Sequence, residues 1–485
     1  MKEKLKVSNL RIHARGNELL HLQQFQLHTG EIHGIIGESG SGKSLFLFAI
    51  MGLLAKGLAF EGEVEMQLDG KSMELFKLTS DAFRKLRGKE MGMVFQEPMS
   101  ALNPRQYCGL QIVEAIRIHE KMDFNSAKNL ALEALKDVEL EDPDRIYHSY
   151  PHQISGGQRQ RVMIAMATIL KPALVLADEP TTALDPETGE AVLKTLVQRC
   201  KSTGSSLILV SHDLKSIAKH SENITVLRKG SLVVAGNTKS VLEGANDYVR
   251  QLLEAATLPE AEISQHSNKK LQVENIKKSF KNRGKTMEVI RNANFEIPAG
   301  ETLGILGKSG SGKSTLAKIL TGLERADAGN VYYSGDNLIS KKITGIQMVF
   351  QDPYASLNNE ITCGSAISEV FLIRGFPSAE AKRRAMNLLE KVGLSNEYYS
   401  RYPHQLSGGQ RQRVCIARAL AADPEILILD EAVAALDPLV QRQVLLLLKD
   451  IQKETGIIYL FITHNPEIAR HFCHSAVAFH NGILS

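Results

Sequence analysis

The sequence predicts two tandem α/β domains, each built on a mainly parallel sheet. Two observations carry this prediction. Short apolar, β-rich runs alternate with helical patterns along the chain, and this order is typical of parallel sheets. The chain also repeats itself with a period of more than 200 residues. That period is too long for a solenoid and long enough for a whole domain.

Composition places the chain among globular proteins. Of its 485 residues, 43% are apolar and 23% are charged, and the formal net charge is +4. These values exclude a disordered, collagenous or coiled-coil chain and give no indication of nucleic-acid binding. The first residues lack the apolar core of a signal peptide, and the longest apolar run, Leu45–Ala55, is too short to span a bilayer. We therefore expect a cytosolic protein with no membrane segment of its own. The five scattered cysteines include no CxxC pair, which predicts buried, reduced thiols.

Three motifs recur in the same order in both halves. GESGSGKS (37–44) returns as GKSGSGKS (307–314), YPHQISGGQRQRV (150–162) as YPHQLSGGQRQRV (402–414), and LVLADEP (174–180) as ILILDEA (426–432). The SGGQ serine precedes the acidic pair by 23 residues in both halves, and the acidic pair precedes a histidine by 34. We therefore expect domains at 1–256 and 271–485, joined by a polar linker at 257–270. The first half carries 15 extra residues around 66–87, which a loop or short helix can absorb.

The GxxxxGKS motif follows an apolar strand and opens a helix in both halves, the context that distinguishes a phosphate-binding loop from a chance match. Its glycines let backbone N–H groups converge on phosphates at a helix N-terminus. Lys43 and Lys313 would bridge phosphate oxygens, and the Ser44 and Ser314 hydroxyls would bind Mg²⁺. A flexible Gly/Ser loop is the alternative, and the second copy argues against it. The nucleotide-binding residues expected in the two loops are Gly37, Glu38, Ser39, Gly40, Ser41, Gly42, Lys43 and Ser44, and Gly307, Lys308, Ser309, Gly310, Ser311, Gly312, Lys313 and Ser314.

Further polar residues follow apolar strands. An aspartate at a strand end can hold Mg²⁺ opposite the phosphate loop, and the glutamate after it can take a proton from the attacking water. The constant spacing of the histidine favours a γ-phosphate sensor over a structural residue. A glutamine after MVF can reach the metal or the water, although a surface glutamine is the alternative. The predicted catalytic residues are Glu179, Glu431, His212, His464, Gln96 and Gln351, and the predicted metal ligands are Ser44, Gln96, Asp178, Ser314, Gln351 and Asp430.

The SGGQ motif is a second anion-binding helix start in each half, because serine is a good N-cap and the glycines expose backbone N–H groups. One nucleotide per half needs only one such start, unless the second serves the nucleotide of the other half. We therefore predict that the halves pair head to tail and share two composite sites. The alternative is that the serine merely caps its helix. The residues concerned are Ser155, Gly156, Gly157 and Gln158, and Ser407, Gly408, Gly409 and Gln410.

Together these motifs resemble the ABC ATPase family over essentially the whole chain. Walker A, Q-loop, signature, Walker B, D-loop (183–185 and 435–437) and H-loop are each present twice. The resemblance implies a P-loop NTPase fold, with a RecA-like core and a helical subdomain in each half, and ATP and Mg²⁺ as cofactors. QEPMSALNP and ADEPTTALDP in the first half are similar to the first ATPase of dipeptide, oligopeptide and nickel importers, and QDPYASLN and LFITHN in the second are similar to their second ATPase.

Two details of the family pattern concern particular residues. The aromatic residue that stacks on adenine in this family corresponds to Phe280 in the second half, whereas the first half offers only His13 and Ala14. The second half has EAVAALD and THN in place of the sequences that are more common at these two motifs in the family. Neither change removes a catalytic group. Because the first half ends without the cysteine cluster of many relatives, we expect no iron–sulfur cluster.

The resemblance also implies a function. The chain would be the ATP-hydrolysing motor of an importer, peripheral on the cytoplasmic face of the membrane, for a peptide, nickel or a metal chelate. Its partners would be two separate membrane permease subunits and, through them, an extracytoplasmic substrate-binding protein, with no nucleic acid. A translation-factor ABC protein acting on ribosomes is the alternative, but those proteins carry a long basic linker, and 257–270 is short and mixed in charge. A sugar-importer ATPase usually has a degenerate second half, and here both halves are intact.

Overall fold

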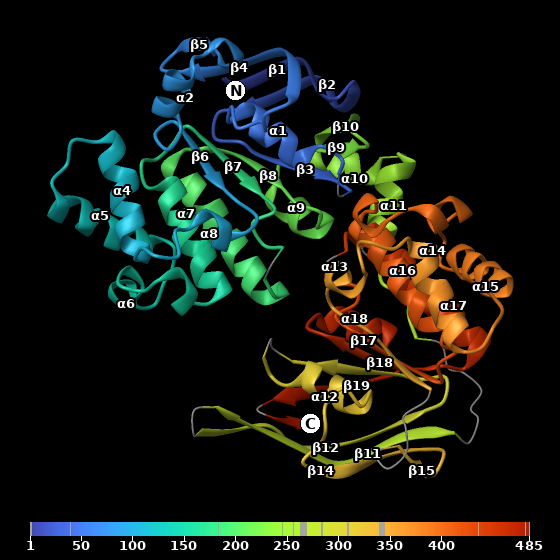
Figure 1. The fold of residues 1–485 in the computed structure, drawn as a ribbon. Coiled ribbons are helices and arrows are strands. Elements are labelled where there is room, and N and C mark those ends of the chain that lie inside the picture. The colour runs from blue at the N-terminus through green and yellow to red at the C-terminus, as the bar shows by residue number, and fades with distance from the viewer. Residues whose placement is uncertain are drawn as a thin grey trace. The chain divides into compact units, whose positions relative to one another are not determined.

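A computed structural model describes residues 2–38, 40–182, 184–244, 246–255, 257–261, 269–282, 285–307, 310–338, 345–434, 436–480 and 482–484. The chain divides into two compact units, Met1–Ala256 and Thr257–Ser485, whose elements are labelled in Figure 1.

The first unit is built on a sheet of ten strands in the order β5-β4-β1-β2-β10-β9-β3-β8-β7-β6. The strands from β9 to β6 in this order are parallel to one another, whereas β2, β1, β4 and β5 are joined antiparallel. The strands are β1 (Glu3–Ala14), β2 (Asn17–His28), β3 (Ile32–Gly37), β4 (Leu58–Leu68), β5 (Lys71–Glu74), β6 (Met91–Val94), β7 (Leu174–Asp178), β8 (Ser206–Val210), β9 (Asn223–Arg228) and β10 (Ser231–Asn237).

Burial explains the two kinds of strand. Every residue of β3, β7 and β8 is buried, as expected for parallel strands covered on both faces. In β1 and β2, buried and more exposed residues largely alternate, which suits an antiparallel layer with one face toward the core. The predicted parallel sheet therefore describes the strands that carry the motifs. The antiparallel strands β1, β2, β4 and β5 were not part of that prediction.

The helices of the first unit fall into two groups. Figure 1 shows α4, α5 and α6 gathered to one side of the unit, which agrees with the helical subdomain implied by the family resemblance. The segment with the extra residues contains β5, η1 and α2. The helices are α1 (Lys43–Ile50), α2 (Ser80–Leu86), α3 (Pro98–Ala101), α4 (Cys108–His119), α5 (Phe124–Asp137), α6 (Pro143–Tyr147), α7 (Gly156–Thr168), α8 (Pro186–Thr203), α9 (Leu214–His220), α10 (Thr238–Glu243) and α11 (Asp247–Ala255), with 3₁₀ turns η1 (Leu75–Lys77) and η2 (Pro151–Gln153).

Helix α1 lies in the hydrophobic core between the antiparallel and parallel parts of the sheet. Its Phe46, Leu47 and Ile50 are fully buried in one cluster with Val7 of β1 and Ile208 of β8. Close packing on both sides fixes this helix. The loop that precedes α1 is therefore attached to a rigid support.

The second unit repeats the topology, with the strand order β15-β14-β11-β12-β20-β19-β13-β18-β17-β16. Its strands are β11 (Lys270–Asn282), β12 (Lys285–Pro298), β13 (Thr302–Leu306), β14 (Ala328–Tyr333), β15 (Asp336–Asn337), β16 (Ile346–Val349), β17 (Ile426–Asp430), β18 (Ile458–Thr463), β19 (Ser475–His480) and β20 (Ile483–Leu484). Its helices are α12 (Lys313–Leu320), α13 (Pro353–Ser356), α14 (Cys363–Ile373), α15 (Ser378–Lys391), α16 (Gly408–Leu420), α17 (Pro438–Thr455) and α18 (Pro466–Phe472), with turns η3 (Asn396–Ser400) and η4 (Pro403–Gln405).

The first residues of the predicted linker pack on the second unit. Leu258 is partly buried against its core, and the backbone N–H of Ala261 donates to the carbonyl of His471 at 2.7 Å. Residues 262–268 of that linker lie outside the described residues. Within the part of the chain that the structure describes, no helix has the length and apolar character to cross a membrane.

Candidate nucleotide-binding sites

In the first unit the phosphate loop joins the end of β3 to the start of the buried helix α1. Gly40 and Gly42 have φ values of 79° and 95°, a backbone region that glycine adopts without strain. A Cβ on Gly37 would come within 2.3 Å of the Leu227 carbonyl and 2.5 Å of the Ser41 hydroxyl. The first residue of this loop therefore leaves no room for a side chain.

The described glycines of the second loop, between β13 and α12, repeat the positive φ values of the first loop. Gly310 and Gly312 have φ values of 79° and 110°, and a Cβ on Gly307 would come within 2.7 Å of the Phe479 carbonyl. Ser39, Lys308 and Ser309, which were also predicted to bind nucleotide, lie outside the described residues.

The lysine of each loop is buried beneath it. The Lys43 ammonium donates to the carbonyls of Gly37 at 2.8 Å and Glu38 at 3.0 Å, and it lies 3.7 Å from a carboxylate oxygen of Glu179. Lys313 donates to the Gly307 carbonyl at 2.7 Å. Each lysine can therefore supply a positive charge at its phosphate loop.

Asp178 and Asp430 lie at the carboxyl ends of β7 and β17 and are 5% and 4% exposed. The Ser44 hydroxyl donates to Asp178 Oδ1 at 2.9 Å. Burial is the leading cause that raises the pKa of Asp178, and the charge of Glu179 adds to it, while Ser44 and Lys43 oppose it. Burial likewise raises the pKa of Asp430.

Three buried oxygen atoms indicate what these sites can hold. The hydroxyls of Ser41 and Ser311 and Oδ1 of Asp430 have no hydrogen-bond partner among the described residues. Buried polar atoms without a partner are costly unless a ligand satisfies them. Serine and aspartate oxygens next to a phosphate loop are the donors that Mg²⁺ prefers when it is bound with a nucleotide. The residues present therefore fit Mg²⁺ and a nucleoside triphosphate.

Glu179 directly follows β7 with a φ of 43°, a region uncommon for residues with a side chain. Its Oε2 lies 3.0 Å from His212 Nδ1 and accepts a hydrogen bond from Thr182 Oγ1 at 2.9 Å. Burial acts to raise the pKa of Glu179, but the hydrogen bond and charge of His212, helped by Lys43, lower it to about 2. Glu179 is therefore ionised and oriented, as a proton acceptor must be.

Glu431 repeats this arrangement with one difference. Its φ is 48°, and His464 Nδ1 lies 3.4 Å from its Oε2; the hydrogen bond from His464 is the leading cause that lowers the pKa of Glu431. Gln351 also donates to Glu431 Oε2 at 2.9 Å. Gln96 is exposed, as Gln351 is, but no side-chain hydrogen bond joins it to another described residue. The structure thus brings Gln351, but not Gln96, to the glutamate of its own unit.

The SGGQ motifs form the same N-terminal cap in both units. The Ser155 hydroxyl accepts from the backbone N–H of Gln158, whose side-chain oxygen accepts from the backbone N–H of Ser155 at 3.0 Å. Ser407 and Gln410 make the same reciprocal pair at the start of α16. The serine therefore does cap its helix, in a capping box.

Several contacts around the sites were not predicted from the sequence. A Cβ on Gly157 would come within 2.5 Å of Thr188 in α8, so this glycine allows two helices to approach closely. Asp185 caps α8 by accepting from the backbone N–H of Thr188 at 3.0 Å. The Asp-Pro pair that opens α8 is a helix-start signal that could have predicted this cap. No sequence motif predicts the hydrogen bond that Thr182 donates to Glu179.

Phe280, the expected adenine-stacking residue, lies on β11 and is 40% exposed. The Lys278 ammonium lies 5.0 Å from the centre of its ring and pairs with Glu324 at 2.7 Å. In the first unit His13 lies on β1 and approaches Glu61 at 3.8 Å, and Ala14 is the last residue of that strand. The Phe280 ring is thus partly exposed, and its stacking on adenine stays a prediction.

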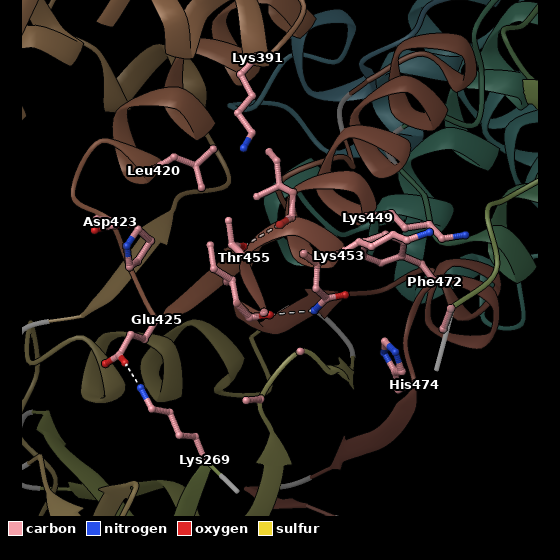
Figure 2. Close-up of a pocket in the computed structure, with 18 of the residues that line it drawn as sticks. Lys269, Lys391, Leu420, Asp423, Glu425, Lys449, Lys453, Thr455, Phe472 and His474 are labelled. Atoms are coloured by element: carbon pink, nitrogen blue, oxygen red, sulfur yellow. Dashed lines mark hydrogen bonds and ion pairs between the residues drawn. The ribbon is translucent and has the colours of Figure 1, made fainter. Parts of the chain in front are cut away.

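A cavity of about 810 Å³ lies in the second unit, and Figure 2 shows the side chains that line it. It is lined by Gly300, Glu425 and Ile457, which directly or closely precede β13, β17 and β18. Lys269 donates to Glu425 there at 2.9 Å. The phosphate loop and Asp430 lie at the opposite, carboxyl ends of these strands, where ligands bind in α/β sheets. This cavity is therefore separate from the candidate nucleotide site.

The fold and these sites define a P-loop nucleoside triphosphatase with two phosphate loops. The family model described as "ABC transporter" matches residues 20–182 and 290–434. The chain therefore belongs to the ABC transporter family and is an ATP-binding ATPase, which confirms the resemblance found in its motifs.

The relatives match along nearly the whole chain. It is 36% identical to the glutathione import ATP-binding protein GsiA of Pectobacterium atrosepticum, over 94% of this chain and 81% of that protein. It is also 36% identical to GsiA of Escherichia coli strain K12 with the same coverage, and 36% identical to GsiA of Salmonella choleraesuis over 98% of this chain and 84% of that protein.

Proposed function

We propose that the chain is the ATP-hydrolysing motor of a membrane importer for a small peptide. The observation that carries the ATPase part is the ionised glutamate held by a histidine beside a buried lysine and aspartate, which occurs in both units. The import part is supported by the similarity to proteins named for glutathione import, and glutathione is a tripeptide. A peptide is thus favoured over nickel or a metal chelate.

The residues divide the work at each site. When bound, ATP would supply the phosphoryl group, and Mg²⁺ would supply positive charge next to the phosphates. Lys43 would hold phosphate oxygens, and Ser44 and Asp178 would hold the metal ion. Glu179 would accept a proton from the attacking water, while His212 keeps its carboxylate ionised and oriented. Their counterparts in the second unit, Lys313, Ser314, Asp430, Glu431 and His464, would act in the same way.

We further propose that the two units pair head to tail, so that the SGGQ helix of one unit completes the phosphate site of the other. A second ring of N–H donors would stabilise charge that develops on the γ-phosphate. The capping boxes use the backbone N–H groups of the serine and the glutamine, so those of Gly156 and Gly408 stay outside the cap and can donate to a phosphate.

The proposed partners are two membrane permease subunits and an extracytoplasmic substrate-binding protein. The chain would then be bound to the cytoplasmic face of the membrane through the permeases. Its relatives are named as ATP-binding proteins of an import system, and such a subunit must reach the transported substrate through other chains.

Uptake in living cells tests this function. Cells that lack the chain should lose uptake of radiolabelled glutathione or another short peptide, and the wild-type chain should restore it. A chain with Glu179→Gln and Glu431→Gln should be made in equal amount and fail to restore it. Loss of nickel uptake with unchanged peptide uptake would overturn the substrate class. Co-sedimentation with ribosomes and no effect on any uptake would favour the translation-factor alternative.

A further inference from the structure

The glutamate of the first unit is joined twice to Thr182, three residues further along the chain. The backbone N–H of Thr182 donates to the Glu179 carbonyl at 3.3 Å, and the Thr182 hydroxyl donates to Glu179 Oε2 at 2.9 Å. This turn is attached to the sheet, because the backbone N–H of Glu179 donates to the Val210 carbonyl of β8 at 3.0 Å. The fold of the backbone therefore sets the position of the hydroxyl next to the carboxylate.

Thr182 and His212 contact the same oxygen of Glu179. His212 Nδ1 lies 3.0 Å from Oε2, whereas the other oxygen, Oε1, lies 3.7 Å from the Lys43 ammonium. The terminal torsion of a glutamate side chain is broad when nothing restrains it. Two partners on one oxygen restrict this rotation, so Oε1 is kept on the side of the phosphate-loop lysine.

The second unit has the same turn without the hydroxyl. Ala434 takes the place of Thr182, and its backbone N–H donates to the Glu431 carbonyl at 3.0 Å. The glutamates themselves have φ values of 43° at Glu179 and 48° at Glu431. A different residue contacts the second carboxylate, because Gln351 donates to Glu431 Oε2 at 2.9 Å. Each glutamate thus has a second polar contact besides its histidine, but the two contacts come from different parts of the chain.

We propose that Thr182 is a positioning residue, whose hydroxyl holds the Glu179 carboxylate in the orientation in which it accepts a proton from the attacking water. In the second unit Gln351 provides the corresponding contact. Orientation of a reacting group lowers the barrier of the chemical step and does not require tighter binding of the substrate. The proposal rests on the proposed function, because it requires that Glu179 accepts this proton.

The test is ATP turnover in a full chain with Glu431→Gln, in which only the glutamate of the first unit can accept the proton. In this chain Thr182→Val keeps the size and branching of the side chain and removes the hydroxyl. We expect kcat to fall about three- to tenfold, the size of one net hydrogen bond, with KM for Mg²⁺-ATP unchanged. Thr182→Ser keeps a hydroxyl and should retain most of the kcat. An unchanged kcat in Thr182→Val, or an equal loss in Thr182→Ser, would overturn the proposal.

Thr181→Val is the matched control, because it removes the neighbouring hydroxyl. Val433 occupies the corresponding position in the second unit. The carbonyls of both residues accept from a leucine backbone N–H, that of Leu184 at 3.0 Å and that of Leu436 at 3.3 Å, so valine is compatible with this turn. Thr181→Val should leave kcat unchanged, and a loss equal to that of Thr182→Val would exclude a specific role of the Thr182 hydroxyl. A lower melting temperature of Thr182→Val with unchanged kcat would show a merely structural threonine.

Coupling between the two sites decides in which chain the variants are compared. If Glu431→Gln alone abolishes turnover, the two sites act only together, and a slower first site then slows the otherwise natural chain by the full factor. The three variants are in that case compared in the natural chain, with the same expected ratios. Failure of the proposed function is distinguishable from failure of this proposal. Turnover near the wild-type rate in the chain with Glu179→Gln and Glu431→Gln would overturn both, whereas loss of turnover there with an unchanged kcat in Thr182→Val would overturn this proposal alone.

Discussion

The carboxylates of Glu179 and Glu431 meet two requirements of a general base, because their lowered pKa values keep them ionised at neutral pH and a histidine orients each of them. We expect Glu179→Gln with Glu431→Gln to lower ATP turnover by about 10²–10⁴-fold, the usual contribution of such a base. ATP binding should persist, because glutamine has the shape of glutamate and the phosphate loops are unchanged. Phosphate release and ATP binding measured on the same preparation check this. Turnover near the wild-type rate would show that another group takes the proton.

Glu31 is a buried carboxylate that serves stability instead of catalysis. It lies before β3, and its oxygens are 3.0 Å from His33 Nδ1, 2.9 Å from His28 Nδ1 and 2.7 Å from Asn223 Nδ2, which donates to it. Burial acts to raise the pKa of Glu31, but the hydrogen bonds from His33 and Asn223 outweigh it and lower the pKa to about 2. The folded state therefore stabilises the ionised form of Glu31.

A depressed pKa in the folded state contributes stability above the unfolded pKa, and this contribution is lost as the pH falls through the folded value. We expect Glu31→Gln to destabilise the protein at pH 7 by about 2–4 kcal/mol, because the buried partners lose their charge acceptor. The difference from wild type should shrink between about pH 4.5 and pH 2. Urea unfolding across this pH range measures it. Glu63→Gln, at an exposed position on β4, should leave stability unchanged, and a Glu31→Gln difference that does not depend on pH would contradict the ionised assignment.

At the scale of elements, the approach of α16 to α17 depends on one glycine of the signature motif. A Cβ on Gly409 would lie 2.5 Å from Val440 of α17, whereas a Cβ on its neighbour Gly408 would meet nothing within 4 Å. We expect Gly409→Ala to cost about 1–3 kcal/mol, as overpacking does. Gly408→Ala is the matched control and should be close to neutral for stability. Thermal unfolding of the two variants checks this, and equal melting temperatures would show that the helices can separate at little cost.

The elements that carry the motifs could be predicted from sequence because their signals are local. Strand β7 and its counterpart β17 are continuous apolar runs that end in an aspartate, and α1 follows a phosphate-loop motif. The antiparallel pairing of β1 with β2 was not predicted, since it depends on which distant strands come to lie beside them. The contact of Gly157 with Thr188 was missed for the same reason. It joins residues on two different helices, and neither residue carries a local signal of the other.

At the scale of the whole molecule, the composite-site proposal predicts which pairs of positions can be crosslinked. Ser41 is a better position for a cysteine than Gly40, because Gly40 has a φ of 79° that strains any residue with a side chain. With ATP, Ser41→Cys should crosslink to Ser407→Cys, and it should not crosslink to Ser155→Cys of its own unit. Glu179→Gln and Glu431→Gln in the same chain should increase the yield by preventing hydrolysis. Crosslinking within one unit, and none between units, would contradict head-to-tail pairing.

The five native cysteines should not interfere with crosslinking or labelling at introduced cysteines. All are buried, and burial raises the pKa of each thiol, to about 11 for Cys108, Cys363 and Cys415 and about 12 for Cys200 and Cys473. Because the thiolate is the reactive form, we expect that these cysteines do not react with maleimides at neutral pH as long as the protein is folded. Spectroscopic labels can therefore be attached to single introduced cysteines in the otherwise natural chain, and any labelling of the native thiols would report the local opening of a core.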